Sequence, residues 1–338
     1  MHRCLELAQS ASADAHPNPM VGAVVVHNDV VIGEGFHQAY GQPHAEVNAI
    51  LNVENADMLR ESTLYVNLEP CSHYGKTPPC ADLIIAREIP KVVIAHTDPH
   101  DKVAGNGIKK LMDAGIDVTL GVLEKEAEHL NRAFITHHKL KRPYVVLKWA
   151  ETSDGFIGRL SNDKNQDPQI SGQLASNYTH KLRAESGAIL VGTNTALLDN
   201  PSLTTRNWPG RNPLRVILDR KARIPMSHKL FQDRYPALVL GPKRSGAPNS
   251  VEFLEVGAKQ EVIPTLLNHL HTLGILQLMV EGGAELIQQF IDTNTWDECH
   301  RIIAPTNWDN GVEAPSLSNI EPTKEFQLGL DLINVYSR

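Results

Sequence analysis

The 338-residue sequence contains no apolar run of the roughly eighteen residues that a membrane-spanning helix needs. Its first residues, MHRCLELAQSA, are too polar for the hydrophobic region of a secretory signal and predict a short amphipathic helix instead. These two absences predict a cytoplasmic protein that has no membrane partner.

Basic residues are scarce relative to acidic ones. The chain has 32 Lys and Arg against 39 Asp and Glu, a formal net charge of −7. Proteins that bind nucleic acid broadly need a basic face, so this balance argues against a nucleic-acid partner. It does not exclude a small anionic substrate, because a few local Arg and Lys residues suffice to hold one.

Cysteine is also rare. The four cysteines, at positions 4, 71, 80 and 299, have irregular spacings that do not suggest a disulfide framework. Two of them, Cys71 and Cys80, lie in one proline-rich loop, LEPCSHYGKTPPC. In a reducing compartment such a close pair indicates metal binding or catalysis.

Hydrophobic patterning divides the chain into two α/β parts. In the first part, apolar and β-branched runs predict strands at 21–26, 30–37, 62–70, 91–99 and 117–122, the first two forming a hairpin. Helices are expected from His44 onward, at 80–89 and at 105–116, and one charged helix over 123–142 closes the part. The predicted first domain is residues 1–141, with a mixed sheet covered on both faces.

The same alternation restarts in the second part. Strands are predicted at 143–150, 188–192, 214–219, 237–241, 276–283 and 298–305, the last of which is expected to end the domain. Helices are predicted at 171–186, 262–275 and 284–293. The second domain is therefore predicted to be another α/β domain, over residues 143–338.

A group of potential zinc ligands lies in the first domain. Catalytic zinc takes three protein ligands and keeps one position for water, and His44, Cys71 and Cys80 offer an imidazole and two thiolates. Glu46 is a neighbouring carboxylate that can move a proton. Because residues i and i+2 of a helix point to nearly opposite sides, His44 and Glu46 can share a site only if His44 lies at the entry to the helix.

These residues follow the order of the H-x-E … P-C-x-x-C signature of zinc base deaminases, although eight residues separate the two cysteines. The longer loop resembles the PCSHxGxTPPC segment of the bifunctional riboflavin-biosynthesis deaminase–reductase family. Three further segments are similar to that family: HPNPMVGAVVV, GEGFHQAYGQPHAEVNAI and DPHDKVAGNGIKKLMDAGIDV. In the last of them His100 stands where Asn is usual.

The resemblance implies a cytidine-deaminase-like α/β/α fold for the first domain. It also implies zinc-dependent hydrolytic deamination of a ribosylated, phosphorylated diaminopyrimidinone, with Glu46 as the catalytic acid–base. The family pattern places the substrate at Asn18, His37, His73, Lys76 and Asp98.

The second domain resembles the reductase half of the same family, which has a dihydrofolate-reductase-like α/β fold and uses NADPH. The segments that carry the resemblance are LKWAETSDG, KLRAESGAILVGTNTALLDNPSLTTR and MVEGGAELI. The resemblance places the nucleotide at Ala150, Gln169, Thr195, Asp199 and the turn at Gly283. It places the substrate at Arg183, Leu203, Arg206 and Glu281.

Residue chemistry supports part of this second site. Arg183 and Arg206 suit a phosphate, because a planar guanidinium donates two hydrogen bonds at once. The glycine pair before 284 lets backbone N–H groups approach an anion, although the G-x-G-x-x-G pattern of a Rossmann site is absent. The family usually carries a Trp where this chain has Gln169, so weaker NADPH binding is expected.

The sequence therefore predicts a bifunctional riboflavin-pathway enzyme that uses zinc and NADPH, acts on a small phosphorylated pyrimidine and, by the family pattern, forms a homo-oligomer. An alternative is a single-function zinc base or nucleoside deaminase with an accessory or inactive reductase-like domain. A second alternative is a zinc-stabilised binding protein, which would need a fourth ligand such as His73.

Overall fold

A computed structural model of the chain describes residues 1–11, 16–74, 78–100, 104–159, 169–258, 261–318 and 320–338. The chain divides into two compact units, Met1–Lys141 and Arg142–Arg338. Among the described residues, no helix combines the length and apolar character that a membrane span requires.

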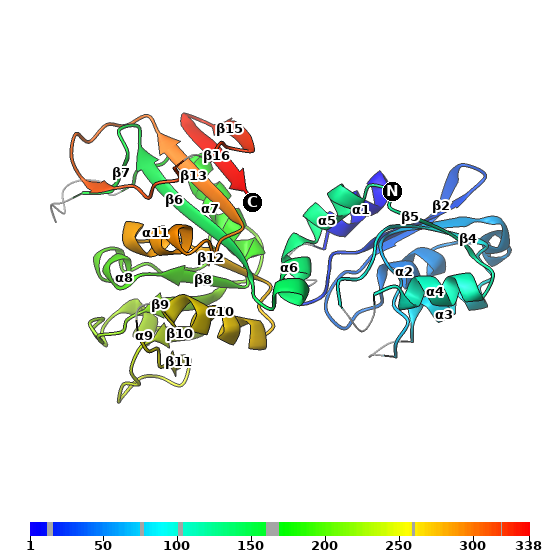
Figure 1. Ribbon diagram of the computed structural model, residues 1–338, viewed down its shortest axis with the longest axis horizontal. Helices are drawn as coiled ribbons and strands as arrows, with labels where there is room; N and C mark the ends of the chain where they lie inside the picture. The colour runs from blue at the N-terminus through cyan, green and yellow to red at the C-terminus, as the bar shows by residue number, and fades with distance from the viewer. Residues whose placement is uncertain (12–15, 75–77, 101–103, 160–168, 259–260, 319) are drawn as a thin grey trace. The chain divides into compact units, whose positions relative to one another are not determined.

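The first unit contains a five-stranded mixed sheet in the order β2-β1-β3-β4-β5 (Figure 1). β1 pairs antiparallel with both β2 and β3, whereas β3, β4 and β5 are parallel. The strands are β1 (Gly22–His27), β2 (Val30–Phe36), β3 (Thr63–Leu68), β4 (Lys91–His96) and β5 (Asp117–Leu120). The predicted hairpin and mixed sheet are confirmed.

Helices cover both faces of this sheet (Figure 1). One face packs against α2 (Ala45–Leu51), α3 (Cys80–Ala86) and α4 (Asn106–Asp113), and the other packs against α1 (His2–Gln9) and α5 (Glu124–Leu130). A Cβ on Gly22 would lie 2.1 Å from the Cys4 carbonyl oxygen, so the contact between α1 and β1 requires glycine. A 3₁₀ helix, η2, spans Ala56–Glu61.

The single helix predicted over 123–142 is wrong. The structure has two helices there, α5 and α6 (Arg132–Leu140), separated by Asn131. The Asn131 side chain accepts a hydrogen bond from the Met20 N–H (2.8 Å) and donates one to the Met20 carbonyl (3.0 Å). This paired contact with a distant segment holds Asn131 outside helical geometry, at φ −97° and ψ 16°. A pattern read along the helix alone could not show it.

The second unit contains a nine-stranded sheet in the order β11-β10-β9-β8-β12-β6-β13-β16-β15. The strands from β11 to β13 are parallel, and β16 and β15 extend the sheet antiparallel. Their bounds are β6 (Tyr144–Thr152), β8 (Ala188–Val191), β9 (Leu214–Leu218), β10 (Ala237–Leu240), β11 (Val251–Leu254), β12 (Gln277–Val280), β13 (Glu298–Ala304), β15 (Lys324–Leu328) and β16 (Asp331–Ser337). A small ribbon joins β7 (Phe156–Gly158) to β14 (Val312–Glu313).

Helices flank this second sheet on both faces as well. α10 (Val262–Thr272) and α11 (Ala284–Asp292) pack on one face, in a core that includes Leu147 and Phe290. α7 (Gln173–Glu185), α8 (Thr193–Asp199) and α9 (Lys229–Gln232) pack on the other. The α/β fold class predicted for both domains is confirmed.

The expectation that 298–305 is the last strand is wrong, because the hairpin β15–β16 follows it. β16 pairs with β13, and its residues are buried on both faces of the sheet. The two strands turn through Gly329, at φ +67°, and Leu330. This turn lacks the Asn-Gly or Asp-Gly pair that most clearly marks a hairpin in a sequence.

Candidate functional site

The three predicted zinc ligands converge at the carboxyl end of β3, the central strand of the first sheet. His44 is the N-cap of α2, Cys71 follows β3, and Cys80 is the first residue of α3. His44 Nδ1 lies 3.5 Å from Cys71 Sγ and 3.3 Å from Cys80 Sγ. A tetrahedral zinc with ordinary bond lengths separates nitrogen and sulfur ligands by about 3.6 Å, so the donor set fits that metal.

Within the described ranges, the only cluster of three or more potential metal ligands is His44, Cys71 and Cys80. His73, the residue considered as a fourth ligand, is not part of it. One imidazole and two thiolates leave a position for water, which is the arrangement of a catalytic rather than a structural zinc site.

Local hydrogen bonds favour the thiolate form of Cys71. The pKa of Cys71 is lowered because the Cys80 thiol donates to its sulfur, with further contributions from His44 and the Cys80 backbone N–H. That N–H lies 3.2 Å from the Cys71 sulfur, and the Ala81 N–H donates to the Cys71 carbonyl at 3.1 Å. The start of α3 therefore holds both cysteines in place and favours the thiolate of Cys71, whereas the hydrogen bond to Cys71 and burial raise the pKa of Cys80.

Glu46 lies in the first turn of α2 and is 3% exposed. Burial, together with the negative charge of Cys71, raises the pKa of Glu46 to about 7. Because His44 caps the helix at φ −71° and ψ 163°, it is not restricted to the helical i, i+2 geometry. His44 lies at the entry to α2, which is the position that the sequence required for His44 and Glu46 to share a site.

A cavity of about 400 Å³ opens onto this cluster. Its lining includes His44, Glu46 and Cys71 together with four of the five predicted substrate residues, Asn18, His37, His73 and Asp98. The fifth, Lys76, lies outside the described residues. Tyr40, Gln42 and Phe134 also line the cavity and were not singled out from the sequence.

His37 is held in one tautomer. Its Nδ1 lies 3.1 Å from the Pro43 carbonyl, which can only accept, so Nδ1 carries the proton. Nε2 then accepts from the Asn18 amide at 2.9 Å. Burial lowers the pKa of His37, which is consistent with a neutral ring. At this point of the lining the cavity therefore presents a neutral imidazole and an amide in fixed orientations.

Glu69 is a further residue of this cavity that sequence reasoning missed. It is 4% exposed and directly precedes Pro70 and Cys71. Its carboxylate accepts hydrogen bonds from four backbone N–H groups: Asp98 (3.1 Å), Gly105 (2.9 Å), Gly107 (2.8 Å) and Ile108 (3.3 Å). A carboxylate directly after a strand was the available signal, but its partners lie about thirty to forty residues away.

His100, at the position where Asn was expected, contacts Asp98 through its backbone. The His100 backbone N–H donates to the Asp98 carboxylate at 2.8 Å. Since the backbone supplies the donor, a change from Asn to His does not remove it.

In the second unit, Arg183 on α7 and Glu281 after β12 form a partly buried two-pronged ion pair. Arg183 Nε lies 2.8 Å from Glu281 Oε1, and its terminal nitrogen lies 2.5 Å from Oε2. Burial alone would raise the pKa of Glu281, but Arg183 and Lys148 outweigh it and lower the pKa. Two predicted substrate residues are thus brought together, with Lys148 beside them.

The loop that carries Leu203 and Arg206 lies against the same helix. Arg206 donates its backbone N–H to His180 Nδ1 at 3.2 Å, and Leu203 is buried at φ +54°. The four predicted substrate residues therefore come from three places. Arg183 lies on α7, Glu281 follows β12, and Leu203 and Arg206 lie on this loop. His180 was not predicted.

A second cavity, of about 420 Å³, lies at the carboxyl ends of β8 and β9, beside the turn into α11. Two of the residues predicted to contact the nucleotide, Thr195 and Gly283, line it, and Gly283 has a φ of +75°. Three cationic residues that were not predicted also line it, Arg220, Lys221 and Arg223. Among the described side chains, the lining does not include Ala150, Gln169 or Asp199.

Gln169 is exposed, and its side-chain nitrogen donates to the Ser171 carbonyl at 2.9 Å. Asp199 ends α8, and burial raises its pKa. Ala150 lies on β6 opposite Ile302 of β13. The nucleotide contacts expected of these three residues stay predictions.

Comparison with known proteins agrees with this geometry. The family description "cytidine and deoxycytidylate deaminase zinc-binding region" matches residues 1–96, and "RibD C-terminal domain" matches residues 143–311. The riboflavin biosynthesis protein RibD of Aquifex aeolicus is 36% identical over 100% of this chain and 97% of its own length. The chain belongs to the RibD family.

Other RibD proteins give the same result. RibD of Escherichia coli is 39% identical over 90% of this chain and 86% of its own length. The solved structure of Acinetobacter baumannii RibD superposes with a TM-score of 0.89 at 34% identity, covering 99% of this chain and 97% of that one. A Thermotoga maritima structure, described as a diaminohydroxyphosphoribosylaminopyrimidine deaminase and 5-amino-6-(5-phosphoribosylamino)uracil reductase, also has a TM-score of 0.89, at 36% identity, covering 100% and 97%.

As a RibD protein, the chain is a bifunctional enzyme of riboflavin biosynthesis, with a zinc-dependent deaminase activity and an NADPH-dependent reductase activity. The predicted function, enzyme class, fold class and cofactors are confirmed. The single-function alternative is not favoured, because the RibD match covers both parts of the chain. The alternative of a non-enzymatic zinc protein is wrong for the same reason.

Glu69→Gln tests the structural role of the buried carboxylate. The substitution replaces one acceptor oxygen by an NH₂ group that faces backbone N–H donors, and we expect it to cost about 1–3 kcal/mol of unfolding free energy. Urea denaturation of the full chain measures the effect, with exposed Glu61→Gln as the control. An unchanged urea midpoint in Glu69→Gln would show that the four contacts do not stabilise the fold.

Proposed function

We propose that residues 1–141 deaminate 2,5-diamino-6-(5-phosphoribosylamino)pyrimidin-4-one and that residues 143–338 reduce the ribosyl group of the product to ribityl. The observation that carries the first assignment is the buried Glu46 beside the His44, Cys71 and Cys80 cluster, in the lining of a cavity of about 400 Å³. The named activities of the Thermotoga maritima relative match these two reactions.

In the deaminase site, His44, Cys71 and Cys80 would hold a zinc ion, which when bound would supply a Lewis acid to activate water. Glu46 holds and moves the proton at its carboxylate. A pKa of about 7 suits that task, since a group that titrates near the working pH can both accept and return a proton. The product of this chemistry is ammonia and the corresponding uracil.

The remaining cavity residues position the pyrimidine and its phosphoribosyl arm. Asn18 and His37 are linked and oriented by the Pro43 carbonyl, so they offer hydrogen bonds in fixed directions. His73 and Asp98 line the same cavity, and the substrate contact of Lys76 stays a prediction. Orientation of a bound substrate by such groups lowers the entropic barrier to reaction.

In the reductase site, the cavity lined by Thr195 and Gly283 holds the nucleotide, and NADPH when bound supplies the hydride. The backbone at Gly283 lets N–H groups approach a phosphate at the start of α11. Arg220, Lys221 and Arg223 add positive charge to the same wall, which suits the phosphates of a dinucleotide. Arg183, Leu203, Arg206 and Glu281 hold the sugar phosphate and pyrimidine of the substrate.

Two expectations concern the cellular setting. The cysteines are free in the described residues, which agrees with a reducing cytoplasm. The homo-oligomer implied by the family pattern stays a prediction.

Cysteine substitution tests the metal assignment. We expect about one zinc per chain in the purified protein, and Cys71→Ser or Cys80→Ser should lose most of that zinc and the deaminase activity, because serine is a poor zinc ligand. Cys299→Ala, which alters a buried cysteine outside the cluster, is the matched control. Metal analysis and ammonia release measure both effects. Full zinc in both serine variants would overturn the assignment.

Glu46→Gln separates proton transfer from metal binding. The glutamine has the same shape but cannot carry the proton, so zinc content should be retained while deamination falls by on the order of a hundredfold or more. Reduction of the deaminated intermediate should continue at the wild-type rate, which serves as the internal control. A parallel loss of both activities would instead mark Glu46 as a structural residue.

A further inference from the structure

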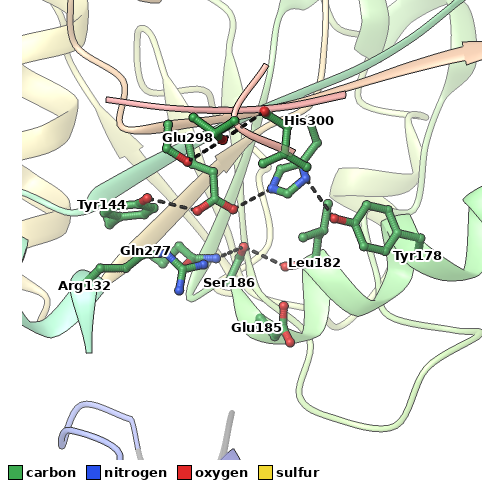
Figure 2. Close-up of polar contacts among 12 residues, drawn as sticks. Arg132, Tyr144, Tyr178, Leu182, Glu185, Ser186, Gln277, Glu298 and His300 are labelled. Atoms are coloured by element: carbon green, nitrogen blue, oxygen red, sulfur yellow. Dashed lines mark hydrogen bonds and ion pairs between the residues drawn. The ribbon is translucent and has the colours of Figure 1, made fainter. Parts of the chain in front are cut away.

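Helix α7 is held firmly against the second sheet on both sides of its functional residues. Figure 2 shows Tyr178 reaching from α7 to His300, whose other ring nitrogen faces Glu298. The Tyr178 hydroxyl lies 2.9 Å from His300 Nδ1, and His300 Nε2 lies 2.7 Å from Glu298. Tyr144 donates to the same carboxylate at 3.0 Å. This buried network anchors the middle of α7 to β13 and β6.

The end of α7 is anchored as well. Gln277 of β12 donates its side-chain N–H to the Ser186 hydroxyl at 3.1 Å, and that hydroxyl donates to the Leu182 carbonyl at 2.8 Å (Figure 2). The stretch that carries His180 and Arg183 lies between these two anchors. It is therefore a rigid platform on which another segment can be positioned.

His180 connects this platform to the loop that carries Arg206. The imidazole is 3% exposed, and its Nδ1 accepts the Arg206 backbone N–H at 3.2 Å. An accepting Nδ1 places the single proton of the neutral ring on Nε2. Burial, reinforced by the charges of Arg183 and Arg206, lowers the pKa of His180 to about 4, so the accepting form persists at neutral pH.

The surroundings of His180 favour an anion. Arg183, Arg206 and Lys148 all contribute positive charge at the ring, and Glu281 is the one negative group among them. Glu281 is already paired with Arg183 in the two-pronged contact. Arg206 is exposed, so its guanidinium can bind a phosphate if its backbone is held in a fixed position.

We propose that His180 is a positioning residue of the reductase site, which accepts the Arg206 backbone N–H through Nδ1 and thereby holds the Arg206 guanidinium for the phosphate of the substrate. Nothing in the family comparison assigns this residue. The inference rests on the proposed role of Arg206, and it extends that role to the residue that fixes the loop.

Three substitutions at one position separate the roles of the ring nitrogens. The side-chain oxygen of asparagine can take the place of Nδ1, whereas the glutamine amide reaches the place of Nε2. We expect His180→Ala and His180→Gln to raise the KM for 5-amino-6-(5-phosphoribosylamino)uracil about tenfold with little change in kcat, since ground-state and transition-state binding are lost together. His180→Asn should stay within about threefold of wild type, the hydrogen bond being retained.

Binding measurements supply a readout that does not depend on turnover. The inhibition constant of ribose 5-phosphate should rise in His180→Ala and His180→Gln by the same factor as KM, while the dissociation constant of NADPH, followed by its fluorescence, stays unchanged. His271→Asn, on α10 at the opposite face of the sheet, is the matched control and should leave all three quantities unchanged.

The outcomes distinguish this inference from the proposed function. If Arg206→Ala leaves KM at the wild-type value, the proposed role of Arg206 fails. If Arg206→Ala raises KM but His180→Ala does not, only the inference about His180 is overturned. Rescue by glutamine and not by asparagine would also overturn it, because Nε2 would then be the functional atom. Rescue by asparagine alone supports it.

Discussion

Four backbone N–H groups from two distant segments converge on the carboxylate of Glu69, and the deaminase site depends on that convergence. Glu69 follows β3, and its partners follow β4 or lie at the start of α4. The carboxyl ends of these two parallel strands are thereby tied together directly beside Cys71. Gly107 is required in this arrangement, since a Cβ there would lie 2.0 Å from the Pro70 carbonyl oxygen.

The two sites use the parallel strands in the same way. Each presents polar side chains where strands end and helices begin. In each, neighbouring groups shift the pKa of a carboxylic acid: Cys71 shifts that of Glu46, and Arg183 shifts that of Glu281. The outcomes differ because the neighbours differ. Burial and the anionic sulfur of Cys71 raise the pKa of Glu46 to about 7, which suits proton transfer. The paired guanidinium of Arg183 keeps Glu281 ionised, which suits binding.

Local sequence patterns predicted most of this fold and the centre of the first site. β-branched runs marked the buried parallel strands, because that pattern is local. His44 lies 27 residues from Cys71 and 36 residues from Cys80, but each of these ligands belongs to a short motif, the His-Ala-Glu triplet or the cysteine loop, that marks it without reference to its partners. The break at Asn131, the pairing of β16 with β13, the Glu69 contacts and His180 were not predictable in that way. Each depends on a partner more than twenty residues distant, which no period or spacing records.

The central claim is that one chain carries out both reactions in order. The most direct test is to incubate the intact zinc-loaded protein with NADPH and 2,5-diamino-6-(5-phosphoribosylamino)pyrimidin-4-one while ammonia and NADPH are followed together. Ammonia should appear first, NADPH oxidation should follow after a lag, and the final amounts of ammonia released and NADPH oxidised should be equal. Oxidation of NADPH without prior ammonia release, or complete deamination that leaves NADPH untouched, would contradict it.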